Sequence, residues 1–221
     1  MPLLIVAPTI LTDDTTKYKL TVETYHAFTK RAQVDISDGS LTLDSVTAPP
    51  TIPDTAVWWP KGWTVDMHLM VSKPSSHVPN LIKLMPNLVI LHPEAEEELP
   101  PIFAALQQNG IKAGVAITRS VYPGALKDLI EVADHAMIFS GILGENGGTA
   151  DLLQLEKVRI IRKIKPTIEI GWDGGANIKN IRTIAQAGVN VINVGSAIIG
   201  AQDPAKMYAA LSAEADKQGV L

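Results

Sequence analysis

Three side chains in this sequence have the types and positions expected of a proton-transfer or metal site. Asp35 and His68 lie in the strand-like runs QVDISDG and TVDMHLMV, and Asp173 ends a third run, TIEIGWDG. Two opposed carboxylates can remove a proton from one face of a carbon and return a proton to the other. Two carboxylates and an imidazole also suit a divalent cation such as zinc, manganese or iron. The residues alone leave both interpretations open.

Glycine-containing turns follow the last three strand-like runs. They are Gly147-Gly148, Gly174-Gly175 and Gly195-Ser196. Glycine allows backbone N–H groups to approach an anion closely, and barrel enzymes often bind phosphate after their late strands. These turns are therefore candidate phosphate-binding residues.

The elements that must position these groups alternate regularly along the chain. Strands are predicted at 3–11, 33–39, 64–71, 88–93, 112–118, 135–141, 167–174 and 189–197, and helices at 15–31, 74–85, 94–109, 124–132, 151–165, 178–187 and 203–218. Within the seventh strand, Glu169, Gly171 and Asp173 share one face because alternate side chains of a strand point the same way. The Thr- and Pro-rich stretch 41–61 has room only for a short helix.

Strand–helix alternation implies parallel βαβ units, and eight units in 221 residues predict one compact (β/α)8 barrel spanning residues 1–221. A doubly wound open sheet is the alternative architecture. Barrel enzymes carry their active sites at the C-terminal ends of the strands, where the candidate residues fall.

Several of these features also have purely structural interpretations. His68 could be a hydrogen-bonded core histidine, and Ser196 could only cap a helix. We expect Asp66 to be paired near the bottom of the barrel, and Glu94–Glu98 to form the solvated first turn of a helix. Trp58-Trp59 could cover apolar surface or form an association surface.

Composition narrows the class of protein. The net charge is −4 and the pI about 5.7, which argues against nonspecific nucleic-acid binding because such binding needs a concentrated basic face. There is no cysteine, so a thiolate nucleophile or thiolate metal site is excluded. The N-terminus lacks the basic region of a signal peptide, and no apolar run approaches the roughly 18 residues of a membrane span. We expect a cytoplasmic protein without nucleic-acid or membrane partners.

The motifs taken together resemble those of the ribulose-phosphate 3-epimerases. They are APTILTDD, VDISDG, VDMHLMV, LHPEA, GIKAGVAI, WDGGAN with IKNI, and AGVNVINVGSAIIG, and they cover essentially the whole chain. The resemblance implies a (β/α)8 barrel that interconverts D-ribulose 5-phosphate and D-xylulose 5-phosphate. The reaction is proton transfer at C3 through an enediolate. It also implies a phosphorylated ketose as partner, a divalent metal as cofactor and self-association into a homo-oligomer.

The resemblance also implies individual roles. Asp35 and Asp173 match the acid/base pair and two metal ligands, and His68 matches a third ligand that also contacts substrate. Thr9 stands where the family has a serine. The resemblance assigns phosphate binding to the turns after the last three strands. Their residues are Gly147, Gly148, Gly174, Gly175, Gly195 and Ser196.

The sequence departs from the family pattern at three places. The family reads His-x-Asp-x-Met-Asp-Gly in its second strand, and here Gln33 replaces the histidine ligand and Ser37 the methionine. An amide oxygen is a poorer zinc ligand than imidazole. Ser37 is expected to make the cavity wetter, and Glu145 adds a negative charge to the loop after the sixth strand. These changes predict a weakened or altered metal site.

Two other functions remain open. One is an epimerase or isomerase of another ketose phosphate, and the other is a barrel that binds a phosphosugar without chemistry. Related decarboxylases and aldolase-like barrels carry a lysine in an Asp-x-Lys-x-x-Asp pattern, whereas this chain reads Asp66-Met67-His68, which argues against those chemistries.

Overall fold

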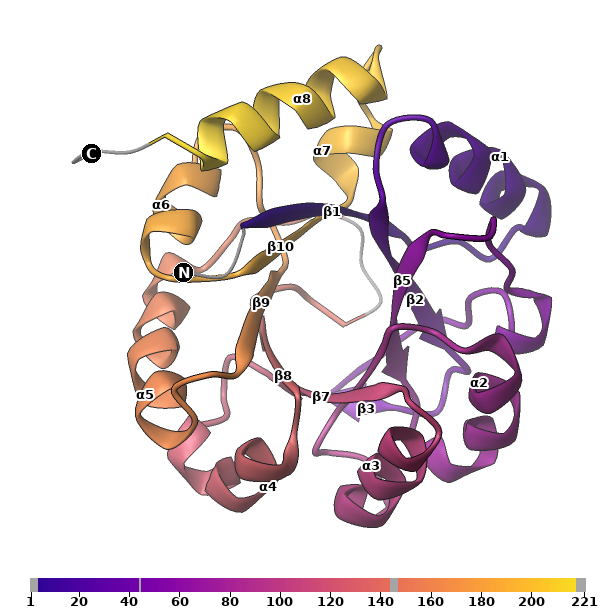
Figure 1. Cartoon of the computed structure of the whole chain (residues 1–221), viewed down its shortest axis with the longest axis vertical. Helices are drawn as coiled ribbons and strands as arrows, with labels where there is room; N and C mark the ends of the chain where they lie inside the picture. Colours follow the sequence, from indigo (N-terminus) through magenta and orange to yellow (C-terminus); the bar gives the residue numbers. More distant parts are fainter. Residues whose placement is uncertain (1–3, 44, 144–146, 218–221) are drawn as a thin grey trace.

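Eight parallel strands close into a barrel in the computed structural model, which describes residues 4–43, 45–143 and 147–217 (Figure 1). In spatial order the strands are β1 (Ile5–Ile10), β10 (Val191–Val194), β9 (Glu169–Asp173), β8 (His135–Phe139), β7 (Lys112–Ile117), β6 (Leu88–Leu91), β5 (Thr64–Met70) and β2 (Arg31–Ser37). Parallel pairing of β2 with β1 closes the circle. The (β/α)8 prediction is confirmed, and the open-sheet alternative is wrong. That all 221 residues form one domain stays a prediction.

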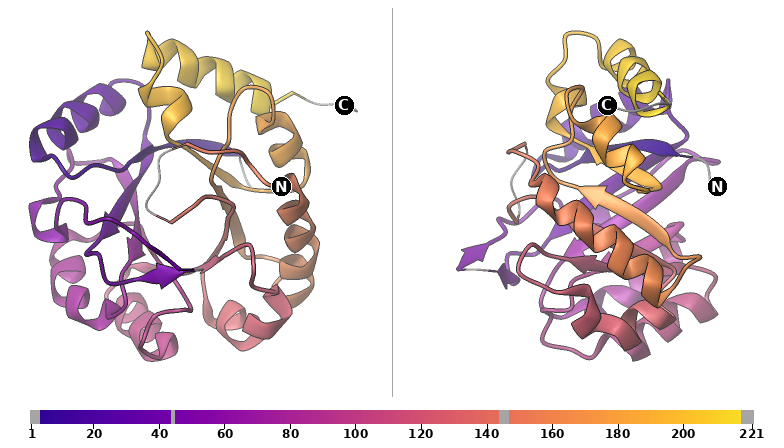
Figure 2. Two further views of the ribbon diagram at one scale, coloured as in Figure 1. Left: turned by 180° about the vertical axis from the view of Figure 1, so that it is seen from behind. Right: turned by 90° about the vertical axis from the view of Figure 1, so that its left-hand side faces the viewer.

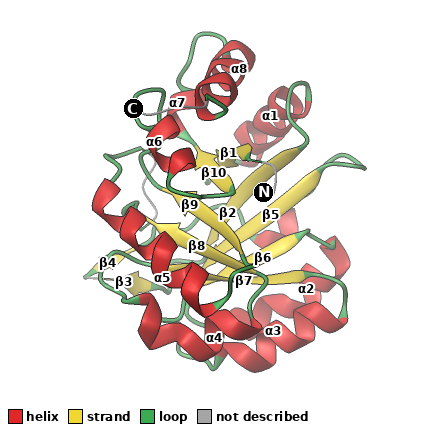
Figure 3. Cartoon of the chain, turned by 60° about the vertical axis from the view of Figure 1, so that its left-hand side comes forward, coloured by secondary structure: helices red, strands yellow, loops and turns green. Residues whose placement is uncertain are grey.

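Helices cover the outside of the barrel (Figure 3). They are α1 (Thr15–His26), α2 (Val78–Leu84), α3 (Leu99–Gln108), α4 (Lys127–Val132), α5 (Glu156–Ile164), α6 (Ile181–Gln186), α7 (Ser196–Ile199) and α8 (Pro204–Ala215). Short 3-10 helices stand at Asp54–Ala56, Pro74–His77, Pro123–Leu126 and Leu152–Leu155. Alternate strand residues such as Met67, Ile170 and Trp172 are fully buried in the layer between strands and helices. No helix in the described part of the chain is long and apolar enough to cross a bilayer.

Inward-facing side chains fill the barrel itself in layers. An apolar cluster inside the barrel includes Leu88, Ile90, Met137 and Phe139, and the buried amides of Gln33 and Asn193 lie beside it. Below them, at the N-terminal ends of the strands, lies a charged layer in which Arg31 contacts Asp66 and Glu169. The expectation that Asp66 is paired near the bottom of the barrel is therefore confirmed.

The helix predicted over 15–31 ends early. Helix α1 stops at His26, and Arg31 is the first residue of β2 rather than the last of the helix. The reason is tertiary: Arg31 is buried inside the barrel between two acids, where its guanidinium forms three hydrogen bonds. That gain outweighs any helical propensity at this position.

The helix predicted from Glu94 starts late. Helix α3 begins at Leu99, with Pro100 and Pro101 in its first turn, where missing backbone N–H groups are tolerated. Had the helix begun at Glu94, both prolines would stand in its interior and break it. Glu94–Glu98 therefore form a loop, and the prediction of a helical first turn is wrong.

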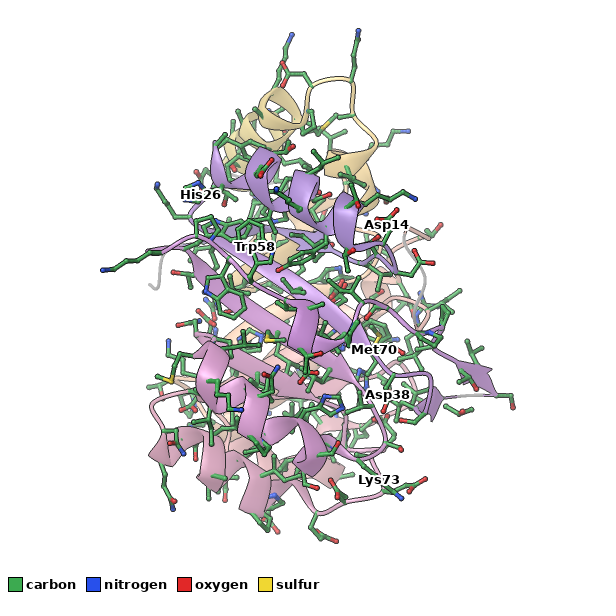
Figure 4. The ribbon with its side chains drawn as sticks, turned by 90° about the vertical axis from the view of Figure 1, so that its right-hand side faces the viewer. Asp14, His26, Asp38, Trp58, Met70 and Lys73 are labelled. Atoms are coloured by element: carbon green, nitrogen blue, oxygen red, sulfur yellow. The ribbon has the colours of Figure 1, made fainter. Side chains whose placement is uncertain are left out.

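The stretch 41–61 contains a small antiparallel hairpin, which the sequence did not predict. Its strands are β3 (Thr42–Leu43) and β4 (Val46–Thr47). The hairpin projects from the face opposite the N-terminus (Figure 2, right). Asp38, Met70 and Lys73 lie at this end, and His26 lies at the other (Figure 4). The hairpin therefore stands at the end of the barrel where the strands finish.

Candidate active site

A narrow cavity of about 40 Å³, partly open to solvent, lies at the C-terminal ends of the strands. Its walls are Thr9, Leu11, Asp35, His68, Met70, Phe139, Gly141, Ile142, Gly147, Asp173, Gly174, Gly175, Ala176, Asn193, Gly195 and Ser196. Nine of the residues singled out from the sequence are among them. Gly148 is next to the wall without lining it, and Gln33 is fully buried beneath it.

Asp35, His68 and Asp173 meet at the base of this cavity. Asp35 and His68 are partners in the register of the neighbouring strands β2 and β5, and Asp173 is the last residue of β9. The Nδ1 atom of His68 is 3.1 Å from Oδ1 of Asp35 and 3.9 Å from Oδ2 of Asp173. One ligand atom from each residue lies within 4.8 Å of the others. Two carboxylates and an imidazole at this spacing fit a divalent cation.

Gln33 does not fit as a fourth ligand in the orientation it has. Its Nε2 group donates to Oδ1 of Asp35 at 2.9 Å and to Oδ2 of Asp173 at 2.5 Å. Its Oε1 atom faces away and accepts a 2.6 Å hydrogen bond from Nδ2 of Asn193. An amide N–H group carries no lone pair for a cation. The carboxylates therefore receive hydrogen bonds where the family pattern places an imidazole ligand.

Asn193 was missed by the sequence analysis. It lies in the middle of β10, on the face of the strand that also carries Gly195, and is almost fully buried. The available signal was an amide inside the otherwise apolar run VINV, two residues before a candidate phosphate turn. A buried amide needs hydrogen-bond partners, and in this barrel one partner is Gln33.

Burial shifts the acids at the base of the cavity toward their protonated forms. Burial raises the pKa of Asp35 to about 7, against the opposing hydrogen bond from Gln33. Burial and the negative charge of Asp35 raise the pKa of Asp173 to about 7, although His68 and Gln33 oppose the shift. Carboxyl groups with pKa values near neutrality suit general acid–base chemistry at neutral pH.

A row of polar side chains, His92, Glu94 and Thr118, extends from His68. The Nε2 atom of His68 lies 2.7 Å from Nε2 of His92, and burial lowers the pKa of each imidazole to about 4. His92 Nδ1 is 3.6 Å from Oε2 of Glu94, whose other oxygen accepts from the hydroxyl of Thr118. Both imidazoles are therefore neutral at pH 7, and His92 holds the ring of His68 in place.

The two glycines after Asp173 are required by a close backbone approach. At Gly174, with φ of +113°, a Cβ would lie 2.1 Å from the backbone nitrogen of Gly141. At Gly175, a Cβ would lie 2.2 Å from that of Ala150. No larger residue fits, so this turn packs directly on the loop after β8. It brings the candidate phosphate turns of β8 and β9 together on one side of the cavity.

Two expectations about cavity polarity have different outcomes. Ser37 does not wet the cavity, because its hydroxyl turns to the 37–51 loop and donates to the carbonyl of Ala48. Glu145 lies outside the described residues. Met70, Phe139 and Ile142 add apolar side chains to the wall instead.

The chain belongs to the ribulose-phosphate 3-epimerase family. The sequence model described as "Ribulose-phosphate 3 epimerase family" matches residues 5–199. The chain is 29% identical to ribulose-phosphate 3-epimerase of Aquifex aeolicus over 143 residues, covering 63% of this chain and 64% of the relative. It is also 29% identical to the chloroplastic ribulose-5-phosphate-3-epimerase of Arabidopsis thaliana over 188 residues, covering 81% and 66%. The chain thus spans slightly less than two thirds of the length of these relatives.

Solved structures support the architecture. The crystal structure of 3-hexulose-6-phosphate synthase from Salmonella typhimurium superposes with a TM-score of 0.69 over 96% of this chain and 98% of that chain, at 16% identity. At this level of identity the likeness concerns the fold alone.

Proposed function

We propose that this protein is an epimerase that interconverts D-ribulose 5-phosphate and D-xylulose 5-phosphate. The observation that carries the proposal is a pair of carboxyl groups, Asp35 and Asp173, at the base of one cavity in a chain of this family. Both have a pKa raised to about 7, so near neutral pH one can be ionised while the other keeps its proton. Epimerisation needs this combination of a base and an acid.

The chemical step moves two protons. One aspartate, as a carboxylate, takes the proton from C3, and the electron pair of the broken C–H bond moves into an enediolate with negative charge on the C2 oxygen. The other, as a carboxylic acid, donates its proton to the opposite face of C3. The carbonyl reforms, and the two aspartates have exchanged protonation states.

The remaining residues bind and orient the substrate. The turns at Gly147, Gly174-Gly175 and Gly195-Ser196 form one side of the cavity and are suited to hold the phosphate through backbone N–H groups. With the phosphate anchored there, the sugar carbons extend toward Asp35 and Asp173 at the base. Met70 and Phe139 exclude water from that region, which strengthens electrostatic interactions there.

The metal site of this family member is altered. Asp35, His68 and Asp173 would hold a divalent cation, which when bound would stabilise the oxygen that becomes negative. Gln33 presents hydrogen-bond donors to the same carboxylates instead of a fourth ligand. We infer a weakened site for zinc, manganese or iron. A cytoplasmic location, a homo-oligomeric state and the absence of nucleic-acid partners stay predictions.

The test is exchange of the C3 proton of D-ribulose 5-phosphate in heavy water, followed by NMR. Wild type is expected to exchange this proton and to form D-xylulose 5-phosphate. Asp35→Asn and Asp173→Asn should each lower the rate by about 10²–10⁴-fold, because each removes a general acid or base. Circular dichroism checks that both variants keep their fold.

The exchange rate is measured on protein treated with a chelator and again after zinc, manganese or iron is added. Binding of the phosphosugar without any exchange would favour the non-catalytic barrel, and exchange only with another ketose phosphate would reassign the substrate. Exchange that survives in either aspartate variant would contradict the acid and base roles of Asp35 and Asp173.

A further inference from the structure

The amide of Gln33 is held at both ends by buried groups. Its N–H end donates to Asp35 and Asp173, and its carbonyl end accepts from Asn193. Gln33 is 0% exposed and Asn193 is 3% exposed, so water does not compete for these bonds. The direction of the Gln33 amide therefore depends on which end of Asn193 faces it.

The orientations of the side-chain amides of Asn193 and Gln33 depend on each other. Its Oδ1 atom is buried without a hydrogen-bond partner in the described part of the chain, and its Nδ2 also approaches Sδ of Met137 at 3.7 Å. Turning Asn193 alone would bring its Oδ1 against Oε1 of Gln33. The two amides can therefore reverse only together, and reversal would give Asn193 Oδ1 a donor while taking from its Nδ2 the acceptor that it has now.

The reversed arrangement of the two amides would require a cation or shared protons beside the aspartates. It would point Oε1 of Gln33 at Oδ1 of Asp35 and Oδ2 of Asp173, which now lie within hydrogen-bond distance of the amide. Three acceptor oxygens converging at such distances repel one another unless a cation or shared protons lie among them. The observed arrangement needs no cation, because the amide itself donates to both carboxylates.

We propose that Asn193 is a positioning residue that locks Gln33 with its N–H group toward the two aspartates, so that an amide takes the place of a divalent cation between them. This inference rests on the proposed function for the role of the aspartates. Its physical content, the direction of one amide and its effect on metal affinity, holds independently of turnover.

The lock is tested by measuring Zn²⁺ affinity of the full chain by isothermal titration calorimetry. Asn193→Asp offers only acceptor oxygens, so it should turn the N–H group of Gln33 toward itself and its oxygen toward the aspartates. Affinity for Zn²⁺ should rise at least about 10-fold, the size typical of changes beside metal ligands. No rise would overturn the proposal.

The added negative charge of Asn193→Asp requires a control. The same substitution is made in a Gln33→Leu background, which keeps the charge and removes the amide. A rise much smaller than in the Gln33 background supports reorientation, and an equal rise in both backgrounds assigns the effect to charge and contradicts the lock. Asn193→Leu, which adds no charge, should raise Zn²⁺ affinity a few-fold by freeing the amide. Unchanged affinity there would also count against the proposal.

A spectroscopic readout follows the amide directly. In protein labelled with ¹⁵N-glutamine, the side-chain signals of Gln33 are identified by their absence in Gln33→Leu. Equimolar Zn²⁺ should leave them in place in wild type and move them in Asn193→Asp. Movement in wild type at equimolar Zn²⁺ would contradict the expectation that Zn²⁺ binds weakly while Gln33 donates to both carboxylates. These outcomes are readable even if the protein turns over no ribulose phosphate.

Discussion

The two ends of the barrel interior both bury acidic side chains, but among the described residues an arginine contacts only the acids at the N-terminal end. There Arg31 donates from Nε to Asp66 at 2.7 Å and from both terminal nitrogens to Glu169, while His135 also contacts Glu169 at 2.9 Å. At the C-terminal end Asp35 and Asp173 share a neutral amide. The same residue types therefore stand in opposite electrostatic environments along the same set of strands.

The pKa values of the acids follow this difference. Burial raises the pKa of Glu169, but hydrogen bonds and charge from Arg31 and His135 outweigh it and hold that pKa well below the usual range. In the part of the chain that the structure describes, Asp35 and Asp173 contact no arginine or lysine, and burial raises the pKa of each to about 7. A paired acid is fixed in one state and stabilises the fold, whereas an unpaired acid can change state during a reaction.

The largest effect on stability is expected from breaking the charged layer at the bottom. Arg31→Met leaves Asp66, which is 2% exposed, and Glu169 without their cation. Removing one partner of a buried ion pair typically costs about 3–5 kcal/mol of unfolding free energy. Urea denaturation measures the loss, with Arg31→Lys as the control that keeps the charge without the forked geometry. A loss below about 1 kcal/mol would mean that the two acids are hydrated or protonated without Arg31.

A smaller change in stability, of opposite sign, is expected when Asp173 at the base of the cavity is replaced by asparagine. The folded pKa of Asp173, about 7, lies above the value of about 3.9 for an unfolded chain. Between these values the folded state keeps a proton that the unfolded state releases, so this group lowers wild-type stability as pH rises from about 4 to 7. In chelated protein, Asp173→Asn should therefore gain stability relative to wild type across that range.

Glu169 supplies the matched comparison for this pH experiment. Its folded pKa is depressed, so its contribution to stability is present above about pH 4.3 and is lost as pH falls. Glu169→Gln should be less stable than wild type at neutral pH, and the difference should shrink in acid. Urea denaturation at several pH values measures both differences, and equal pH trends for the two variants would contradict the contrast between the layers.

The smallest effect is expected at the edge of the lower layer. Nδ2 of Asn87 donates to Oδ1 of Asp66 at 2.8 Å, which is the oxygen that Arg31 does not reach through Nε. Asn87→Ala should lower the unfolding free energy by about 1–2 kcal/mol, since it removes a hydrogen bond to a buried charged group. Asn109→Ala, which removes an exposed amide, serves as the control. Equal losses in the two variants would show that Asp66 does not depend on Asn87.

The sequence by itself determined the barrel and the face on which the chemistry lies. Strand periodicity placed Gln33 and Asp35 on one side of β2, and Glu169 and Asp173 on one side of β9, because side chains alternate along a strand whatever it pairs with. Turn residues marked where each strand ends. Both signals are local, so they could be recognised before any contact was known.

Only the tertiary structure decided which of these side chains meet. Gln33 contacts Asn193, 160 positions further along the chain, and Arg31 contacts Glu169, 138 positions further along. Closing the barrel places β1 between β10 and β2, with β9 on the far side of β10, and no spacing within one strand encodes those neighbours. The direction of the Gln33 amide decides whether Asp35 and Asp173 face hydrogen-bond donors or an oxygen. That direction depends on Asn193, which no local sequence pattern could identify as a neighbour of Gln33.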